Sequence, residues 1–181
     1  MTGSGSGLRE AVPPPEALRA GLADSAAAVR RYLFGMCGDW EQAEDIAQEA
    51  LLKAWSRREG FDGRSSVRTW LFTIARNSWL DRLRRKKTAL QETSLEQAYD
   101  IAASSGHSPA TAASHRELSA AIHGAMMRLP AEQREALALR ESEAMTFEQI
   151  AGLLGVPTAT VKSRVRYALL KLGEDLKDFK E

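Results

Sequence analysis

The chain has 181 residues, of which 44% are hydrophobic, and its formal net charge is +1. This composition suits one medium domain or two small ones, and it excludes a chain that is basic throughout. A single cysteine, Cys37, excludes an intrachain disulfide and a cysteine zinc site, and we expect it to be a buried apolar residue. Because the sequence shows neither a signal peptide nor an apolar run of about 18 residues, we expect a cytoplasmic protein with no membrane insertion.

Residues 1–15 combine Gly-Ser repeats with three prolines and predict a flexible tail, in which residues 1–7 are either native or an added linker. A helical pattern follows, with a break near residues 35–38. Its apolar residues are Leu18, Leu22, Val29, Leu33 and Phe34. Asp39 is placed to cap a second helix that extends to about residue 59. The apolar stripe of that helix consists of Ile46, Ala50, Leu51, Ala54 and Trp55.

The stretch TWLFTIARNSWLDRLRRKK, residues 69–87, contains no Pro or Gly and predicts one helix with two apolar sides. At about 100° per residue, Trp70 and Trp79 point in opposite directions. The inward stripe contains Trp70, Leu71, Ile74 and Ala75, and the second stripe contains Phe72, Arg76, Trp79 and Leu83. Trp79 either stacks on a base or packs against a neighbouring helix, and we favour packing slightly.

Residues 88–114 are rich in Ala, Ser and Thr, and their only charges are Glu92, Glu96 and Asp100. They predict a flexible acidic linker that could include a short helix over residues 95–101. A second helical block covers residues 115–176, and residues 177–181 form a tail. No segment shows strand-like alternation. The predicted fold is therefore all-α, with two small helical domains, residues 16–87 and 115–176, joined by the linker.

The segment FEQIAGLLGVPTATVKSRVRYALLKL, residues 147–172, has the pattern of a helix-turn-helix motif. Thr146 and Gln149 can form a capping box, and Gly155 suits the left-handed backbone of the turn. Val156 fills the turn, and Thr158 can cap the second helix. The first helix turns Ile150 and Leu154 inward, and the second turns Val161, Val165, Ala168, Leu169 and Leu172 inward.

The outward residues of this second helix include four basic side chains and no acidic one, so the helix can lie in the major groove of duplex DNA. The candidate contacts are Thr158, Thr160, Lys162, Ser163, Arg164, Arg166 and Tyr167. The alternative is an ordinary helical hairpin with a solvated basic face. Residues 60–87 likewise carry eight basic residues and two acidic ones among aromatic side chains, a combination used to bind single-stranded nucleic acid.

Three segments, EDIAQEALLKAW, FDGRSSVRTWLFTIARNSWLDRLRR and LPAEQREALALRESEAMTFEQIAGLLGVPTATVKSRVRYAL, together resemble a bacterial extracytoplasmic-function (ECF) sigma factor. The resemblance covers residues 24–176. It implies a sigma region 2 domain for recognition of the promoter −10 element, residues 16–87. It also implies a region 4 domain for the −35 element, residues 115–176, whose second helix would hold the seven candidate contacts. The expected partners are core RNA polymerase and promoter DNA, duplex at −35 and single-stranded at −10.

The resemblance also assigns individual residues. It implies that the β′ clamp helices of the polymerase are bound by Asp45, Gln48, Glu49, Leu52 and Lys53. The alternative is that these residues form a solvated amphipathic face. The C-terminal domain should bind the β-flap. Contacts to the −10 element fall to Phe61, Arg64, Ser65, Ser66, Val67, Arg76, Asn77, Trp79, Arg84 and Arg85. Many relatives carry an aromatic residue in place of Val67, so the base preference stays open, and Phe61 and Val67 could instead pack between helices.

The linker should reach the active-site and RNA-exit channels of the polymerase, where acidic residues can mimic nucleic acid. Control by an anti-sigma factor would require a separate protein. We assign no role to His107, His115 and His123. No cofactor, metal site or catalytic constellation is expected, so the chain is predicted not to be an enzyme. A stand-alone helix-turn-helix regulator and a nucleic-acid-processing enzyme are the competing classes.

Overall fold

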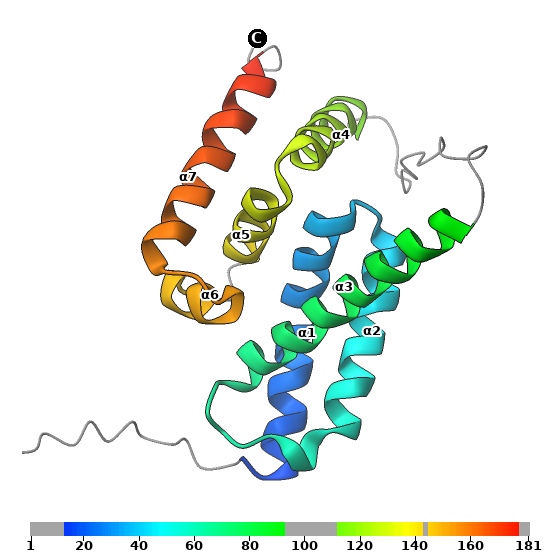
Figure 1. Ribbon diagram of the computed structural model, residues 1–181, viewed down its shortest axis with the longest axis vertical. Helices are drawn as coiled ribbons and strands as arrows, with labels where there is room; N and C mark the ends of the chain where they lie inside the picture. Colours follow the sequence, from blue (N-terminus) through cyan, green and yellow to red (C-terminus); the bar gives the residue numbers. More distant parts are fainter. Residues whose placement is uncertain (1–12, 93–111, 143–144, 178–181) are drawn as a thin grey trace, which may run out of the picture.

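The computed structural model describes residues 13–92, 112–142 and 145–177, and in these ranges the chain is helical with no strand. The elements are α1 (Pro15–Cys37), α2 (Trp40–Ser56), the 3₁₀ turn η1 (Arg58–Gly60), α3 (Val67–Glu92), α4 (Ala112–Arg128), α5 (Ala131–Glu141), α6 (Phe147–Leu154) and α7 (Thr158–Asp175). Figure 1 shows α1, α2 and α3 as one group and α4 to α7 as another. The predicted all-α fold is confirmed. None of the described helices is long and apolar enough to cross a membrane.

The first group is a three-helix bundle in which α2 presents small residues to its neighbours. Ala43, Ala47, Ala50 and Ala54 are buried along one side of α2, together with Ile46. Small side chains let the backbones of neighbouring helices approach closely, and α2 packs against both α1 and α3. The large core side chains come from the partners, above all Tyr32 and Leu33 of α1 and Leu71 and Phe72 of α3.

Local capping signals define the ends of α1 and α2. Gly38 adopts a left-handed conformation with φ 76°, and its N–H donates to the carbonyl of Phe34 at 2.7 Å. A residue with a Cβ atom is disfavoured there, so Gly38 terminates α1 cleanly. Asp39 then accepts the backbone N–H of Gln42 at 3.0 Å and caps α2, as predicted.

The C-terminal group contains the predicted helix-turn-helix. Thr146 and Gln149 form both hydrogen bonds of the capping box, and Gly155 in the turn has φ 67°. Two details were wrong. Pro157, and not Thr158, precedes α7, because Thr158 is already its first helical residue and makes no capping bond. Leu169 is 52% exposed, since it projects beyond the side of α7 that α5 and α6 cover.

The long helix α3 differs from its predicted limits in one respect. It begins at Val67 and continues to Glu92, so its last turn extends into the residues assigned to the linker, and α4 begins at Ala112 within that same range. The possible helix over residues 95–101 lies outside the described residues. Both apolar sides of α3 are buried in its first half, including Leu71, Phe72 and Ile74, whereas Leu83 is exposed.

The two apolar sides of α3 are buried mainly because α3 packs against both α1 and α2, with Phe72 against Tyr32 of α1. The two halves of the chain also pack against each other, since α1 lies along α5 and α3 touches α5 and α6. The buried apolar residues of both halves form one continuous cluster, from Leu18 to Ala168. The sequence predicted two helical units, but it gave no indication that they would share a core.

Candidate nucleic-acid and polymerase interfaces

Helix α7 presents the candidate duplex-DNA face. Val161, Val165 and Ala168 are buried and hold the helix against α5 and α6. On the other sides, Lys162, Ser163, Arg166 and Tyr167 are exposed, while Thr158, Thr160 and Arg164 are half-buried. The seven predicted contacts therefore lie on one helix, and four of them are exposed. A helix with a free basic face can enter a major groove.

Several basic side chains of α7 already have partners within the C-terminal half. Arg164 forms an ion pair with Glu132 of α5, and the ammonium of Lys162 lies 5.8 Å from the ring centre of Phe147. Arg166 makes no hydrogen bond or ion pair with the described part of the chain. Arg166 is thus the arginine of this helix whose donors are free to meet a phosphate or a base edge without breaking an existing contact.

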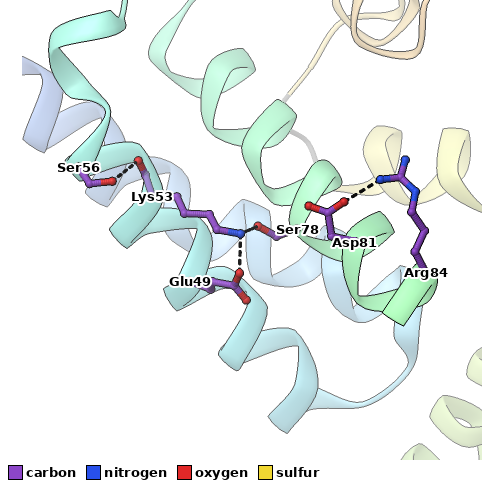
Figure 2. A network of polar contacts seen from close by, with 6 residues as sticks. All are labelled: Glu49, Lys53, Ser56, Ser78, Asp81 and Arg84. Carbon is purple, nitrogen blue, oxygen red and sulfur yellow. Dashed lines mark hydrogen bonds and ion pairs between the residues drawn. The ribbon is translucent and has the colours of Figure 1, made fainter. Parts of the chain in front are cut away.

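The candidate −10 residues of α3 divide by accessibility. Asn77, Arg84 and Arg85 are exposed, and Arg84 pairs with Asp81 at 2.7 Å (Figure 2). Trp79, by contrast, is only 7% exposed and belongs to the core. It cannot stack on a base in this conformation, so the structure agrees with the packing alternative for Trp79. The accessible candidates on this helix are polar and basic.

The loop before α3 contains the remaining −10 candidates. Phe61 is 4% exposed and lies 4.9 Å from Trp70, ring centre to ring centre, so it packs between helices and offers no free aromatic face. Gly63 has φ 68°, and Asp62 accepts the backbone N–H of Arg64 at 3.1 Å. Ser66 accepts the backbone N–H of Thr69 at the start of α3. Internal hydrogen bonds therefore fix the loop.

A hollow of about 630 Å³ lies beside this loop. It is lined by Ser66 of the loop, by Val67 at the start of α3, and by Arg140 and Gln149 of the C-terminal half. Val67 is half-buried and packs toward Gly21 of α1, because a Cβ atom on Gly21 would lie 3.2 Å from a methyl group of Val67. Residues of the C-terminal half were not predicted to share this hollow, since their proximity depends on the packing of the two halves.

The outer face of α2 holds the candidate polymerase contacts. Leu52 is 71% exposed, and Asp45 and Gln48 are exposed beside it. Glu49 and Lys53 form an ion pair one turn apart, and Lys53 also donates to the hydroxyl of Ser78 at 3.0 Å (Figure 2). Lys53 therefore also ties α2 to α3. Trp55, three positions after Leu52 on α2, is also exposed, and neighbouring apolar side chains of this kind are a feature that a partner protein can cover.

Arg76, the remaining −10 candidate on α3, already has a partner within the chain. Its guanidinium donates to both carboxylate oxygens of Glu135 on α5, at 2.8 and 3.2 Å, and the hydroxyl of Tyr32 on α1 donates to the same carboxylate at 3.2 Å. The hydrogen bond with Glu135 raises the pKa of Arg76, and burial, followed by the charge of Glu135, raises the pKa of Tyr32 well above its ordinary value. Glu135 was missed because its sequence neighbourhood is that of any helical glutamate.

The sequence assigned no functional role to the histidines or to the cysteine. The ring of His123 lies 5.4 Å from that of Phe34, and burial lowers the pKa of His123. Cys37 is half-buried, donates to the carbonyl of Asp39 and has a pKa raised by burial, which disfavours the reactive thiolate. His107 and the side chain of His115 lie outside the described residues. No group of three potential ligands is arranged around a metal position in the part of the chain that the structure describes.

Both halves of the chain are similar to known proteins. Residues 23–89 match the Sigma-70 region 2 family, and residues 119–172 match the Sigma-70, region 4 family. The ECF RNA polymerase sigma factor SigL of Mycobacterium tuberculosis is 36% identical over 156 residues, which cover 86% of each chain. SigW of Bacillus subtilis, also an ECF RNA polymerase sigma factor, is 31% identical over 156 residues, or 83% of each chain.

A solved structure shows the same fold over nearly the whole chain. The sigma factor RpoE from Bartonella quintana, crystallised in complex with the anti-sigma factor NepR, superposes with a TM-score of 0.69. The sequences are 28% identical, and the match covers 90% of this chain and 98% of that chain. With both sigma regions present in order and relatives similar over most of their length, the chain belongs to the ECF sigma factors, which bind core RNA polymerase and promoter DNA in promoter-directed transcription.

Proposed function

We propose that this sigma factor recognises a −35 element with α7 and a −10 element with α3 and its preceding loop, and that it assists melting of the −10 element. The observation that carries the proposal is the exposed face of α7 with Lys162 and Arg166, which lies within the region 4 match. A chain with one surface for duplex DNA and another for single-stranded DNA suits a promoter that is double-stranded at the −35 element and melted at the −10 element.

At the −35 element, the proposed contacts are Thr158, Thr160, Lys162, Ser163, Arg164, Arg166 and Tyr167. At the −10 element, Asn77 is the proposed base-edge reader, while Arg84 and Arg85 hold phosphates and Arg64, Ser65, Ser66 and Val67 border the extruded base. Extrusion of a base costs a few kcal/mol, so the loop must compensate with edge contacts. Because Phe61 and Trp79 are buried, we assign them the support of this surface and no stacking role.

Transcription in vitro tests the proposal. The purified chain is mixed with core RNA polymerase and a library of promoter fragments, and transcript starts are mapped. We expect starts at a restricted set of promoters that share −35 and −10 sequences. Transcription that is no more selective than that of core polymerase alone would contradict the proposal.

The polymerase contact is proposed to involve the outer face of α2. Asp45, Gln48, Glu49, Leu52 and Lys53 would meet the β′ clamp helices, with Leu52 as the apolar anchor because of its exposure. Leu52→Ser should leave the fold intact, since the side chain contributes little to the core, and should weaken co-elution with core polymerase. The C-terminal half is proposed to bind the β-flap. The linker carboxylates Glu92, Glu96 and Asp100 would act in initiation, so neutralising them should impair initiation more than promoter binding.

Control by a separate anti-sigma factor is part of the proposal, because the similar RpoE was solved in complex with one. We place the protein in the cytoplasm with the polymerase, and we propose that it has no catalytic activity of its own. The competing function is a stand-alone helix-turn-helix regulator. Such a protein would bind a specific duplex tightly without polymerase, so a binding measurement with and without core polymerase separates the two.

A further inference from the structure

The contact between the two halves of the chain suggests how the unbound protein is kept inactive. We propose that the chain is autoinhibited by a latch, formed by Tyr32, Arg76 and Glu135, which must open before both promoter elements can be bound. The inference rests on the proposed roles of α3 and α7 in −10 and −35 recognition. It adds to them a closed state that the chain maintains without any other protein.

The latch joins three helices from both halves. Glu135 of α5 is only 9% exposed, and it receives Arg76 of α3 through two hydrogen bonds and Tyr32 of α1 through a third. A carboxylate so placed is stable only while its partners remain, because an unpaired buried charge is costly. The charges can regain water if the two halves separate. Loss of one partner is therefore expected to open the chain before it unfolds either half.

Close packing surrounds the latch. Gly35 of α1 faces Ala138 of α5 so closely that a Cβ atom on Gly35 would lie 2.9 Å from the Cβ of Ala138. The imidazole of His123 on α4 covers Gly38, where an added Cβ would lie 1.9 Å from a ring carbon. Arg31 of α1 donates to the carbonyl of Ser142 at 3.1 Å. The interface thus combines charge pairing with steric fit, and either can be disturbed separately.

The closed state is incompatible with simultaneous contact at both elements. Positions −10 and −35 are about 25 base pairs apart, which corresponds to roughly 85 Å of B-form duplex at about 3.4 Å per base pair. In the closed chain, α3 touches α5, and α5 packs directly on α7. Helices are about 10–12 Å in diameter, so the two proposed DNA faces lie only a few helix widths apart. A duplex this short is stiff and does not fold back to meet both faces.

The latch also occupies a side chain that is a candidate for contact with DNA. The guanidinium of Arg76 is a candidate phosphate or base ligand of the −10 element, yet in the closed chain both carboxylate oxygens of Glu135 hold it. One guanidinium fork cannot serve the carboxylate and a phosphate in the same geometry. Since only the open fraction of the chain binds the promoter, the apparent affinity falls in proportion to that fraction.

Two independent substitutions test the latch. Glu135→Gln removes the charge that holds Arg76 and leaves Arg76 itself in place. Gly35→Leu inserts a side chain against Ala138, and because Gly35 lies within α1, leucine suits the backbone there. The matched controls are Glu41→Gln on the exposed surface of α2 and Gly173→Leu on α7, where an added Cβ meets nothing within 4 Å.

The first readout is the distance between spin labels on Ala20→Cys and Glu174→Cys in a Cys37→Ser background, measured by pulsed electron resonance on the full chain. Both positions are exposed and lie in opposite halves. We expect one narrow distribution for the unmodified interface and for both controls. Glu135→Gln and Gly35→Leu should each add a second, broad population, because the separated halves take many relative positions. If neither variant changes the distribution, the latch does not hold the chain closed.

The second readout is promoter-specific transcription at limiting core polymerase. Both opening variants should raise it several-fold over the wild type, and the difference should disappear at saturating polymerase, which opens the chain by mass action. Opening without any gain at limiting polymerase would overturn autoinhibition. If the wild type directs no specific transcript even at saturating polymerase, the proposed function fails, while the distance measurement still decides whether the closed state exists.

Discussion

At the scale of single residues, accessibility separates side chains that the sequence grouped together. Asn77 and Trp79 lie two positions apart on α3, and both were candidates for contact with the −10 element. The structure exposes Asn77 and buries Trp79 in the apolar cluster. An aromatic residue beside basic ones has two possible explanations, and only the packing of neighbouring helices decides between them.

Trp79→Ala should therefore act on stability. Removing a large buried aromatic side chain costs about 3–5 kcal/mol of unfolding free energy. Denaturant unfolding followed by circular dichroism measures this loss. Trp79→Phe should retain most of the stability, and Asn77→Ala, at an exposed position, should change it by less than about 0.5 kcal/mol. A fully stable Trp79→Ala variant that fails to melt promoters would show instead that the indole contacts DNA.

Arg166→Ala tests the basic face of α7. If Arg166 contacts a phosphate, its loss weakens binding of all promoter sequences alike and lowers the slope of log K against log salt by about one. Binding of labelled promoter DNA by the polymerase complex at several salt concentrations gives this slope. Lys177→Ala, an exposed position beyond α7, removes the same charge and should leave the slope unchanged. Relaxed discrimination at one base pair would indicate base reading instead.

At the scale of secondary-structure elements, the helix-turn-helix depends on local signals. The capping box at Thr146 satisfies backbone donors at the start of α6, and Gly155 permits the left-handed turn into α7. These features set the direction in which the chain enters α7. The packing of α6 on α7, with Ile150 and Ala151 buried, then holds the angle between the two helices. The position of the proposed DNA-reading helix therefore depends on residues that do not face DNA.

Thr146→Ala should destabilise the C-terminal half. Loss of an N-cap side chain costs about 0.5–2 kcal/mol, because the backbone N–H of Gln149 loses its partner. Thermal unfolding should show a lower midpoint. Gly152→Ala is the opposite control, since an added Cβ there meets nothing within 4 Å and alanine favours a helix by up to about 1 kcal/mol. An unchanged midpoint for Thr146→Ala would mean that tertiary packing alone holds α6.

The same locality explains which elements the sequence could predict. Asp39, Thr146 and Gly155 act on residues within one turn, so their roles follow from spacing. The inward stripe of α7 was mostly right, and Leu169 failed because the pattern does not show how wide the covered side of a helix is. The family resemblance supplied the order of the regions and the assignment of surfaces, which no local rule contains.

At the scale of the whole molecule, the closed packing of the halves was beyond prediction. Glu135 and Arg76 are 59 residues apart, and neither stands out among the charged residues of its helix. The composition of the linker predicted two separate helical domains. That composition describes how flexible the connection is, and it carries no information on the surfaces of the domains that the linker brings together. The shared core, the burial of Arg76 and the hollow beside Val67 all follow from that one interface.

The interface also predicts a pH dependence of closure that centres on His123. In the closed chain, burial and then the charge of Arg134 lower the pKa of His123, while in the open chain the exposed imidazole returns to about 6.5. Well above pH 6.5 the side chain is neutral in both states and does not affect the equilibrium. As the pH falls below about 6.5, the open chain binds the proton more readily, so closure loses stability. Arg31 and Glu141 line the same groove, and their net charge offers no strong compensation.

The distance distribution between labels at positions 20 and 174, recorded from pH 7.5 to pH 5.5, measures this effect. We expect the broad population of the open chain to grow as the pH falls in the wild type. In His123→Gln, which keeps a polar side chain without a titrating imidazole, the population should stay nearly constant over the same range. An identical pH profile in both proteins would assign the titration to another group at the interface. Because a neutral His123 leaves closure intact, inhibition should be strongest at neutral pH, where Phe34, Gly38 and His123 remain in contact.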